Sequence, residues 1–105
     1  MEDHKKYRVI VSERAKQMLG TQLRFLAQTS KSAATKEKKL ITSAIRSLSE
    51  MPQRFPFLDE EMIPRNKYRK MFVERRYLVL YQIWDDVVNV TTIIDCRQDY
   101  GWLIR

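Results

Sequence analysis

Residues 68–96, YRKMFVERRYLVLYQIWDDVVNVTTIIDC, carry the strongest secondary-structure signal of this 105-residue chain. The segments 68–73, 77–84 and 87–96 are rich in β-branched and aromatic residues with a period of two, which is typical of strands. The two connections between these segments are short enough for tight turns. The pattern therefore predicts a meander of three antiparallel strands.

A different periodicity precedes the meander. Over residues 13–29, and again from about 33 to 50, apolar side chains recur every three or four positions, which predicts two amphipathic helices joined as an antiparallel hairpin. Ser12 supplies an N-cap for the first helix, and Pro52 ends the second. The run YRVIV, residues 7–11, predicts a leading strand.

The segment 51–67 contains all three prolines of the chain and shows no period, so it predicts a loop. The element order is then β-α-α-β-β-β. It predicts one α+β domain spanning residues 1–105, in which a two-helix hairpin packs on one face of an antiparallel sheet. The other face would lack a helical cover. Alternation along the last strand places Ile93, Asp95 and Arg97 on that uncovered face, although a one-residue bulge would reverse the assignment.

The charge balance indicates the kind of partner. Twenty Lys and Arg against thirteen Asp and Glu give a formal net charge of +7, which favours nucleic acid, the ribosome, an anionic membrane surface or an acidic protein. A basic protein without such a partner is the alternative.

A cluster of six cations within twelve positions is interleaved with Tyr68, Tyr77 and Tyr81, a pattern that suits contact with single-stranded RNA. The cations are Arg65, Lys67, Arg69, Lys70, Arg75 and Arg76. The alternative is that the tyrosines are core residues and that the cations protect sheet edges from aggregation.

Composition excludes several chemistries. His4 is the one histidine and Cys96 the one cysteine, so no metal site, no Cys–His or Ser–His–Asp arrangement and no intramolecular disulfide is predicted. With two glycines there is no phosphate-binding loop, and no cofactor is expected. The start MEDHKKYRV has no apolar run of signal-peptide length, and no segment is long enough to span a bilayer. The sequence therefore predicts a cytoplasmic protein with no membrane partner.

Metal-free cleavage of RNA stays open, because the 2′-hydroxyl of RNA can attack the adjacent phosphate. The reaction needs cations for the developing charge, which Arg69 and Arg97 would supply. It also needs a base, which would be Asp99 or a lysine or tyrosine with a lowered pKa. Tyr100 would hold the attacking group or stack on a base.

The whole arrangement resembles one known family. The leading strand, the helical hairpin, MPQRFP at 51–56 and the motifs Y-R-x-x-F, Y-L-V-L-Y-x-I-x-D-D and R-x-D-Y within 68–100 are similar to the RelE/ParE superfamily of bacterial type II toxins. The resemblance covers nearly the whole chain. It implies a growth-inhibiting toxin of bacteria that is silenced by an acidic, partly disordered antitoxin wrapped around it. RelE-type members cleave mRNA in the ribosomal A site, whereas ParE-type members inhibit DNA gyrase.

The resemblance also implies roles for single residues. Arg97 stands where RelE-type toxins have a phosphate-binding arginine, and Arg69 stands at a basic strand position of those enzymes. Tyr100 is a candidate for their C-terminal tyrosine, and Lys67 or Lys70 would contact the RNA backbone.

Two departures weaken the likeness to the RNA-cleaving type. Leu78 and Met71 stand where those enzymes have an arginine and a lysine. The pairing of Arg97 with Asp99 is more similar to the ParE branch. The predicted function is a toxin that cleaves ribosome-bound mRNA, with inhibition of DNA gyrase or a decayed protein of low toxicity as alternatives.

Overall fold

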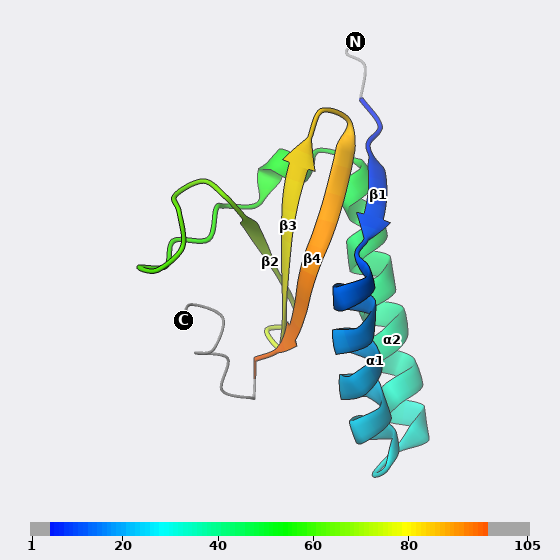
Figure 1. The fold of residues 1–105 in the computed structure, drawn as a ribbon. Helices are drawn as coiled ribbons and strands as arrows, with labels where there is room; N and C mark the ends of the chain where they lie inside the picture. Colours follow the sequence, from blue (N-terminus) through cyan, green and yellow to red (C-terminus); the bar gives the residue numbers. More distant parts are fainter. Residues whose placement is uncertain (1–4, 97–105) are drawn as a thin grey trace.

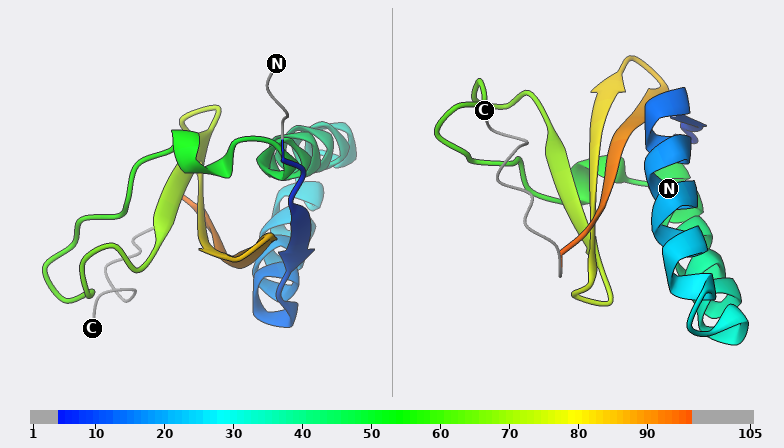
Figure 2. Two further views of the ribbon diagram at one scale, coloured as in Figure 1. Left: turned by 90° about the horizontal axis from the view of Figure 1, so that it is seen from above. Right: turned by 60° about the horizontal axis from the view of Figure 1, so that its bottom comes forward.

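The computed structural model describes residues 5–96 and has the predicted element order (Figure 1). A helical hairpin lies on one side of the sheet, and the long connection that follows it extends away on the other side (Figure 2). The predicted α+β class is confirmed. The elements are β1 (Arg8–Val11), α1 (Glu13–Ala27), α2 (Lys31–Arg46), the 3-10 turns η1 (Ser47–Ser49) and η2 (Pro52–Arg54), β2 (Arg69–Val73), β3 (Tyr77–Trp84) and β4 (Val87–Asp95).

The sheet has four strands in the order β1-β4-β3-β2. The strands β2, β3 and β4 form the predicted antiparallel meander, whereas β1 pairs in parallel with β4. Parallel neighbours need a long crossover connection, and the helical hairpin is part of that crossover. The sheet is therefore mostly antiparallel, with one parallel pair at the β1 side.

Both helices begin at a serine N-cap. The Ser12 hydroxyl accepts a hydrogen bond from the Ala15 N–H (3.1 Å), and the Ser30 hydroxyl accepts one from the Ala33 N–H (3.1 Å). Because Ser30 is the cap, α2 begins at residue 31 and not at 33. It ends at Arg46 and not near residue 50, because the chain tightens there into η1. Neither helix is long and apolar enough to cross a bilayer.

The main core lies between the hairpin and the sheet. Ala15 of α1 and Ile41 of α2 are fully buried and belong to one cluster with Val79, Tyr81 and Val88 of the sheet. Tyr81, like the helix-facing Tyr77, is therefore a core residue. The alternative interpretation of the tyrosines, as core and not as an RNA-stacking surface, is correct for these two.

A buried carboxylate connects α2 to the start of β3. Glu37 accepts hydrogen bonds from the Tyr77 hydroxyl and from the Arg76 guanidinium, and it forms an ion pair with Arg76. Burial is the main reason why the pKa of Tyr77 lies above its ordinary value, and the Glu37 carboxylate adds to the shift. The charge of Arg76 is therefore partly balanced inside the fold.

A β-bulge changes which residues of β4 face the helices. The register shifts between Leu80 and Tyr81, which leaves Thr91 as an extra residue of β4. Beyond it the alternation is reversed, and Ile93 is fully buried in the helix-side core. The prediction that Ile93 and Asp95 lie on the uncovered face is wrong for this reason.

The sheet face away from the helices is partly covered by the connection between α2 and β2. Leu78 and Leu80 of β3 form a second, smaller apolar cluster with Leu58, and Ile63 and Tyr68 pack against it half-buried. Residues of the predicted loop thus bury apolar side chains that no helix covers.

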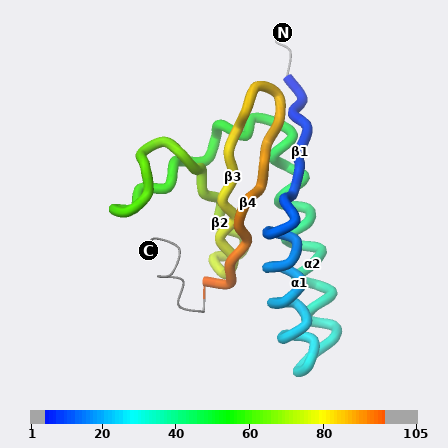
Figure 3. Tube along the Cα trace, in the orientation of Figure 1, coloured from blue at the N-terminus to red at the C-terminus, as the bar shows by residue number. Residues whose placement is uncertain are grey.

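The shortness of β1 leaves part of the β4 edge to α1. Figure 3 shows the chain running from β1 directly into α1 beside β4. The Ser12 N–H donates to the Val90 carbonyl (2.9 Å), and the Gln22 side-chain amide donates to the Ile93 carbonyl (2.7 Å). These bonds satisfy backbone groups that a bare strand edge would expose.

Candidate functional site

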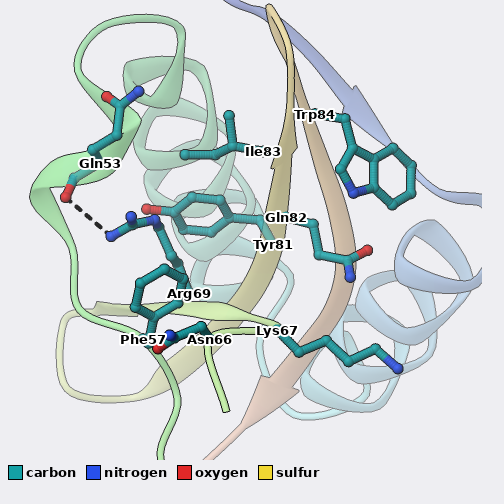
Figure 4. Close-up of a pocket in the computed structure, with 9 residues that line it drawn as sticks. All are labelled: Gln53, Phe57, Asn66, Lys67, Arg69, Tyr81, Gln82, Ile83 and Trp84. Carbon is teal, nitrogen blue, oxygen red and sulfur yellow. Dashed lines mark hydrogen bonds between the residues drawn. The ribbon is translucent and has the colours of Figure 1, made fainter. Parts of the chain in front are cut away.

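The strand β3 continues past the end of β2. The two strands pair only as far as Arg69 opposite Tyr81, so Gln82–Trp84 has no part of β2 beside it. A pocket of about 460 Å³ opens at this place (Figure 4). Cations, amides and aromatic side chains come together in it. Its lining residues are Gln53, Phe57, Asn66, Lys67, Arg69, Tyr81, Gln82, Ile83 and Trp84.

Arg69 holds one wall of the pocket in place. Its guanidinium donates to the carbonyls of Phe55 (2.7 Å) and Gln53 (3.1 Å), and it stacks over the Phe57 ring with 4.0 Å to the centroid. The Lys70 N–H donates to the Pro56 carbonyl (2.9 Å) and extends this attachment along the backbone. Arg69 therefore fastens residues 53–57 to β2, and part of its hydrogen-bonding capacity is used within the fold.

Tyr81 closes the inner end of the pocket. Its hydroxyl is buried and donates to the Pro52 carbonyl (2.7 Å). Burial raises the pKa of Tyr81 to about 12, although the nearby Arg69 and Arg54 charges lower it somewhat. This phenol stays protonated at neutral pH, so it is poorly suited to take a proton from a substrate.

Two aromatic side chains at the pocket are open to solvent. Trp84 is 56% exposed and Phe57 is 37% exposed. In Figure 4 the side chains of Gln82 and Trp84 lie on one side of β3 and those of Tyr81 and Ile83 on the other, so the pocket reaches around the strand edge. An exposed tryptophan in a pocket that also contains a cation such as Lys67 can bind another protein or stack on a nucleobase.

The six clustered cations do not form one surface. Lys67 and Arg69 line the pocket, and Arg65 lines the adjoining hollow with Asp59. Lys70 is half-buried on β2 at the position opposite Leu80. Arg75 and Arg76 lie at the other end of β2, in the turn to β3, where Arg76 binds Glu37. Their predicted role in nucleic-acid binding stays a prediction.

The predicted residues Arg97, Asp99 and Tyr100 lie outside the described residues. Cys96, the last described residue, is half-buried and packs against the second apolar cluster. Burial, with a smaller contribution from Asp95, raises the pKa of its thiol, which disfavours the reactive thiolate. Within residues 5–96 no three His, Cys, Asp or Glu side chains are grouped so that they could hold a metal ion.

The fold and the pocket can now be compared with known proteins. A family model described as the ParE toxin of the type II toxin-antitoxin system parDE matches residues 9–100. The chain belongs to the ParE toxin family. No curated protein matches it.

A solved structure entitled "Chromosomal ParDE TA system from P. aeruginosa" is similar to this ParE-family chain with a TM-score of 0.71. The match covers 87% of this chain and 97% of the other, at 13% sequence identity. Identity this low shows a shared fold, and the earlier resemblance to the RelE/ParE superfamily is confirmed by the two comparisons together.

In this ParE-family chain both positions that depart from the RNA-cleaving type are buried. Met71 is 3% exposed and packs in the helix-side core, and Leu78 is 2% exposed in the second cluster. A lysine or arginine at either place would need a buried partner, because an unpaired charge in an apolar core is costly. The two positions therefore serve packing.

Sequence reasoning missed the amide side chains of the pocket and its tryptophan. Gln53, Asn66 and the β3 residues Gln82 and Trp84 come from separate segments of the chain, and none is a cation of the basic cluster. The one available signal was Trp84, a large aromatic residue directly before the Asp85-Asp86 turn and therefore at the exposed end of a strand.

Proposed function

We propose that this ParE-family chain is a growth-inhibiting toxin that binds DNA gyrase and does not cut RNA. The observation that carries the proposal is the burial of Met71 and Leu78 in the two apolar clusters. The side chains at these two positions are uncharged packing residues. They cannot supply the positive charges that RNA cleavage would use at these positions. Inhibition by binding needs a contact surface and no acid–base pair.

The two buried tyrosines of the core support the same choice. RNA cleavage needs a group that accepts a proton near neutral pH. The buried phenols of Tyr77 and Tyr81 both have pKa values above the ordinary one, so neither is available as a base. The part of the chain that the structure describes contains no histidine.

The contact surface that we propose is the rim of the pocket. Trp84 and Phe57 are large and open to solvent, and they line the pocket from opposite sides of β3 together with Lys67 (Figure 4). Tryptophan and other aromatic residues contribute a large share of the binding energy at protein interfaces. The strand edge at Gln82–Trp84 adds backbone groups that β2 leaves unpaired.

The partner that silences the toxin is an acidic antitoxin. The family to which the chain belongs is described by its toxin-antitoxin system, and the formal charge of +7 suits an acidic protein.

Cleavage of ribosome-bound mRNA is the second candidate. The combination of Trp84, Phe57 and Lys67 in one pocket favours it, because stacking groups beside a cation suit single-stranded RNA. Arg69, Arg97, Asp99 and Tyr100 would then carry the reaction.

The test combines two readouts with one pair of matched variants. Purified toxin is added to gyrase that is supercoiling a relaxed plasmid, and to ribosomes that are translating a defined mRNA. We expect loss of supercoiling with intact mRNA. Trp84→Ala should weaken inhibition by at least about tenfold, as for an interface hot spot. Phe25→Ala, which removes a comparably exposed aromatic residue from α1, should inhibit like the parent.

Cleaved mRNA with unaffected supercoiling would establish the second candidate. In that case Arg97→Ala should abolish cleavage. If the parent protein affects neither reaction, or if Trp84→Ala inhibits gyrase as strongly as the parent, the proposal is wrong.

A further inference from the structure

The edge of β3 that faces β2 is open over its last residues. The paired part of the two strands ends where Arg69 lies opposite Tyr81, and β3 then continues to Trp84. On its other edge β3 stays paired with β4 as far as Trp84. Among the described residues, no strand therefore lies beside Gln82–Trp84 on the β2 side.

The alternation of the backbone shows which groups face this open edge. In an antiparallel sheet a residue directs its N–H and its carbonyl to the same neighbouring strand, and the next residue directs them to the other side. The Lys70 N–H donates to the Pro56 carbonyl, away from β3, so Arg69 is directed at β3 and its partner Tyr81 at β2. Two positions further along β3, the N–H and the carbonyl of Ile83 are therefore directed at the side where β2 has no residue.

The pocket of about 460 Å³ follows this edge on both faces of the sheet. Figure 4 shows Gln53 and Ile83 on one side of β3 and Gln82 and Trp84 on the other, and the Lys67 side chain extends to the side of Gln82 and Trp84. A strand added to a sheet places successive side chains on alternate faces. A space that lies on both faces of a strand edge therefore has the form of a slot for one extended segment.

Two other strand edges of the sheet are covered by the fold. Residues 56–58 pair with the outer edge of β2, where the Leu58 N–H donates to the Tyr68 carbonyl (2.7 Å), and α1 lies beside β4. The chain does not cover the end of β3 in this way, because it turns at Asn66, with a left-handed φ of 60°, before it enters β2. An uncovered strand edge offers its backbone groups to another chain.

We infer that the edge at Ile83 accepts an extended segment of DNA gyrase as a short added strand. This mode of binding rests on the proposed function, because it specifies how the same partner is held. Main-chain hydrogen bonds to Ile83 fix the register of the segment, and the exposed Trp84 supplies packing area beside it. The slot lies within the rim that we propose as the contact surface, so one partner occupies both.

The lining also predicts the order of side chains in the segment. An antiparallel partner runs in the direction of β2, so three successive residues face Trp84, Ile83 and Gln82 in that order. Residues directly opposite each other have their side chains on the same face. The first residue is therefore an apolar one that packs on Trp84, and the second is a β-branched apolar one beside Ile83. The third is acidic, because Lys67 lies on the side of Gln82.

Other occupants fit the slot less well. A single strand of nucleic acid can contact Trp84 and Lys67, but it lacks the regularly spaced peptide groups that pair with the backbone of Ile83. A second copy of this chain carries the same formal charge of +7, which opposes association.

Binding is tested by fluorescence anisotropy with a designed peptide of about eight residues that has leucine, valine and glutamate in this order at its centre. In a series of peptide variants one backbone nitrogen at a time is methylated, which removes one donor. Methylation at the valine, whose N–H faces the Ile83 carbonyl, should weaken binding by about tenfold or more. Methylation at either neighbour, whose N–H points away from β3, should weaken it by less than about threefold. The Ile83 amide proton should exchange more slowly with solvent in the complex.

Matched charge reversals locate the slot. Lys67→Glu should weaken peptide binding by about tenfold, and a peptide with lysine in place of the glutamate should recover it. Arg75→Glu makes the same change of net charge at the opposite end of β2, in the turn to β3, and should change binding by less than about threefold. Equal losses for the two variants, or equal losses throughout the methylation series, would overturn the slot.

Gyrase supercoiling is measured in the same mixtures. Excess peptide should relieve inhibition by the parent toxin, whereas the peptide methylated at valine should not. Binding with the expected alternation but without relief would overturn gyrase as the occupant. A toxin dimer, seen by light scattering and dissociated by the peptide, would assign the slot to a second copy and overturn it as well. If the parent toxin does not inhibit gyrase, the proposed function fails, and the methylation series decides on the slot independently.

Discussion

The hairpin and the remainder of the fold use their cations differently. On the hairpin, eight cations face two acids, whereas residues 47–96 contain seven cations and eight acids. Within that second region three arginines bind groups of the fold itself. Arg54 donates to the Glu50 carbonyl (2.5 Å), Arg69 donates to two carbonyls of 53–55, and Arg76 pairs with Glu37. The densest run of cations in the sequence is therefore partly used by the fold itself, through Arg69 and Arg76.

The largest expected effect breaks the ion pair between Glu37 and Arg76, which links the two regions. Glu37→Ala leaves the Arg76 guanidinium and the Tyr77 hydroxyl without their buried partner, and should lower the free energy of unfolding by about 2–3 kcal/mol. Arg76 is partly exposed, which keeps the loss below that of a fully buried pair. Urea unfolding measures the change, with the same dependence of the free energy on urea concentration expected for variant and parent. The neighbouring exposed Lys36→Ala should stay within about 0.5 kcal/mol, and equal effects of the two changes would contradict this role of Glu37.

The second effect tests whether Arg69 is used by the fold. Arg69→Ala removes two hydrogen bonds to carbonyls and the stacking on Phe57, and should cost about 1–2 kcal/mol. Residues 53–57 should also become more sensitive to limited proteolysis. The exposed Arg75→Ala in the β2–β3 turn is the matched control, with a change within about 0.5 kcal/mol. If residues 53–57 of Arg69→Ala resist proteolysis as well as those of the parent, contacts other than those of Arg69 hold this segment in place.

The third effect is a pH dependence that belongs to the sheet region. The pKa of Tyr81 rises from 10.0 to about 12 on folding. The contribution of this phenol to the free energy of unfolding is therefore fully present below pH 10 and is lost as the pH rises toward 12. The free energy of unfolding of the parent should therefore fall over this pH window, and that of Tyr81→Phe should fall less steeply. At pH 7 the same variant should lose about 1 kcal/mol, because the Pro52 carbonyl loses its donor. Identical slopes for variant and parent from pH 10 to 12 would exclude Tyr81 as a source.

The smallest effect has the opposite sign and belongs to the hairpin. Gly20→Ala should raise the free energy of unfolding by about 0.5–1 kcal/mol, because the helix gains propensity and the contacted Arg24 side chain can move. Thermal unfolding measures the gain. A destabilised variant would show that the Arg24 side chain does not move aside for a methyl group at position 20.

Most of the fold could be predicted from local patterns. The meander, the helical hairpin and the serine cap of α1 each depend on residues close together in the chain, and their periods are clear. The parallel pairing of β1 with β4 joins residues about 80 positions apart. The bulge at Thr91 changes the faces of β4 without any mark in the alternation of β4 itself.

The candidate site was less predictable for a related reason. Lys67 and Arg69 were found through their charge, but whether a cation binds a ligand or the fold depends on partners distant in sequence. Glu37 lies 39 residues before Arg76, and Gln53 lies 16 residues before Arg69. The pocket results from a difference in length between two paired strands. β2 begins at Arg69, opposite Tyr81, whereas β3 continues to Trp84. Amino-acid composition does not encode this difference.

The position of Arg69 has a thermodynamic consequence for anything that enters the pocket. One side chain contacts the Phe57 ring inside the site and the carbonyls that hold residues 53–57 in place. Occupancy of the pocket and order of this segment are therefore linked equilibria, and each must favour the other by the same factor. A ligand that stacks on Phe57 would slow amide exchange in 53–57, and a change that loosens 53–57 would weaken the ligand even without touching it.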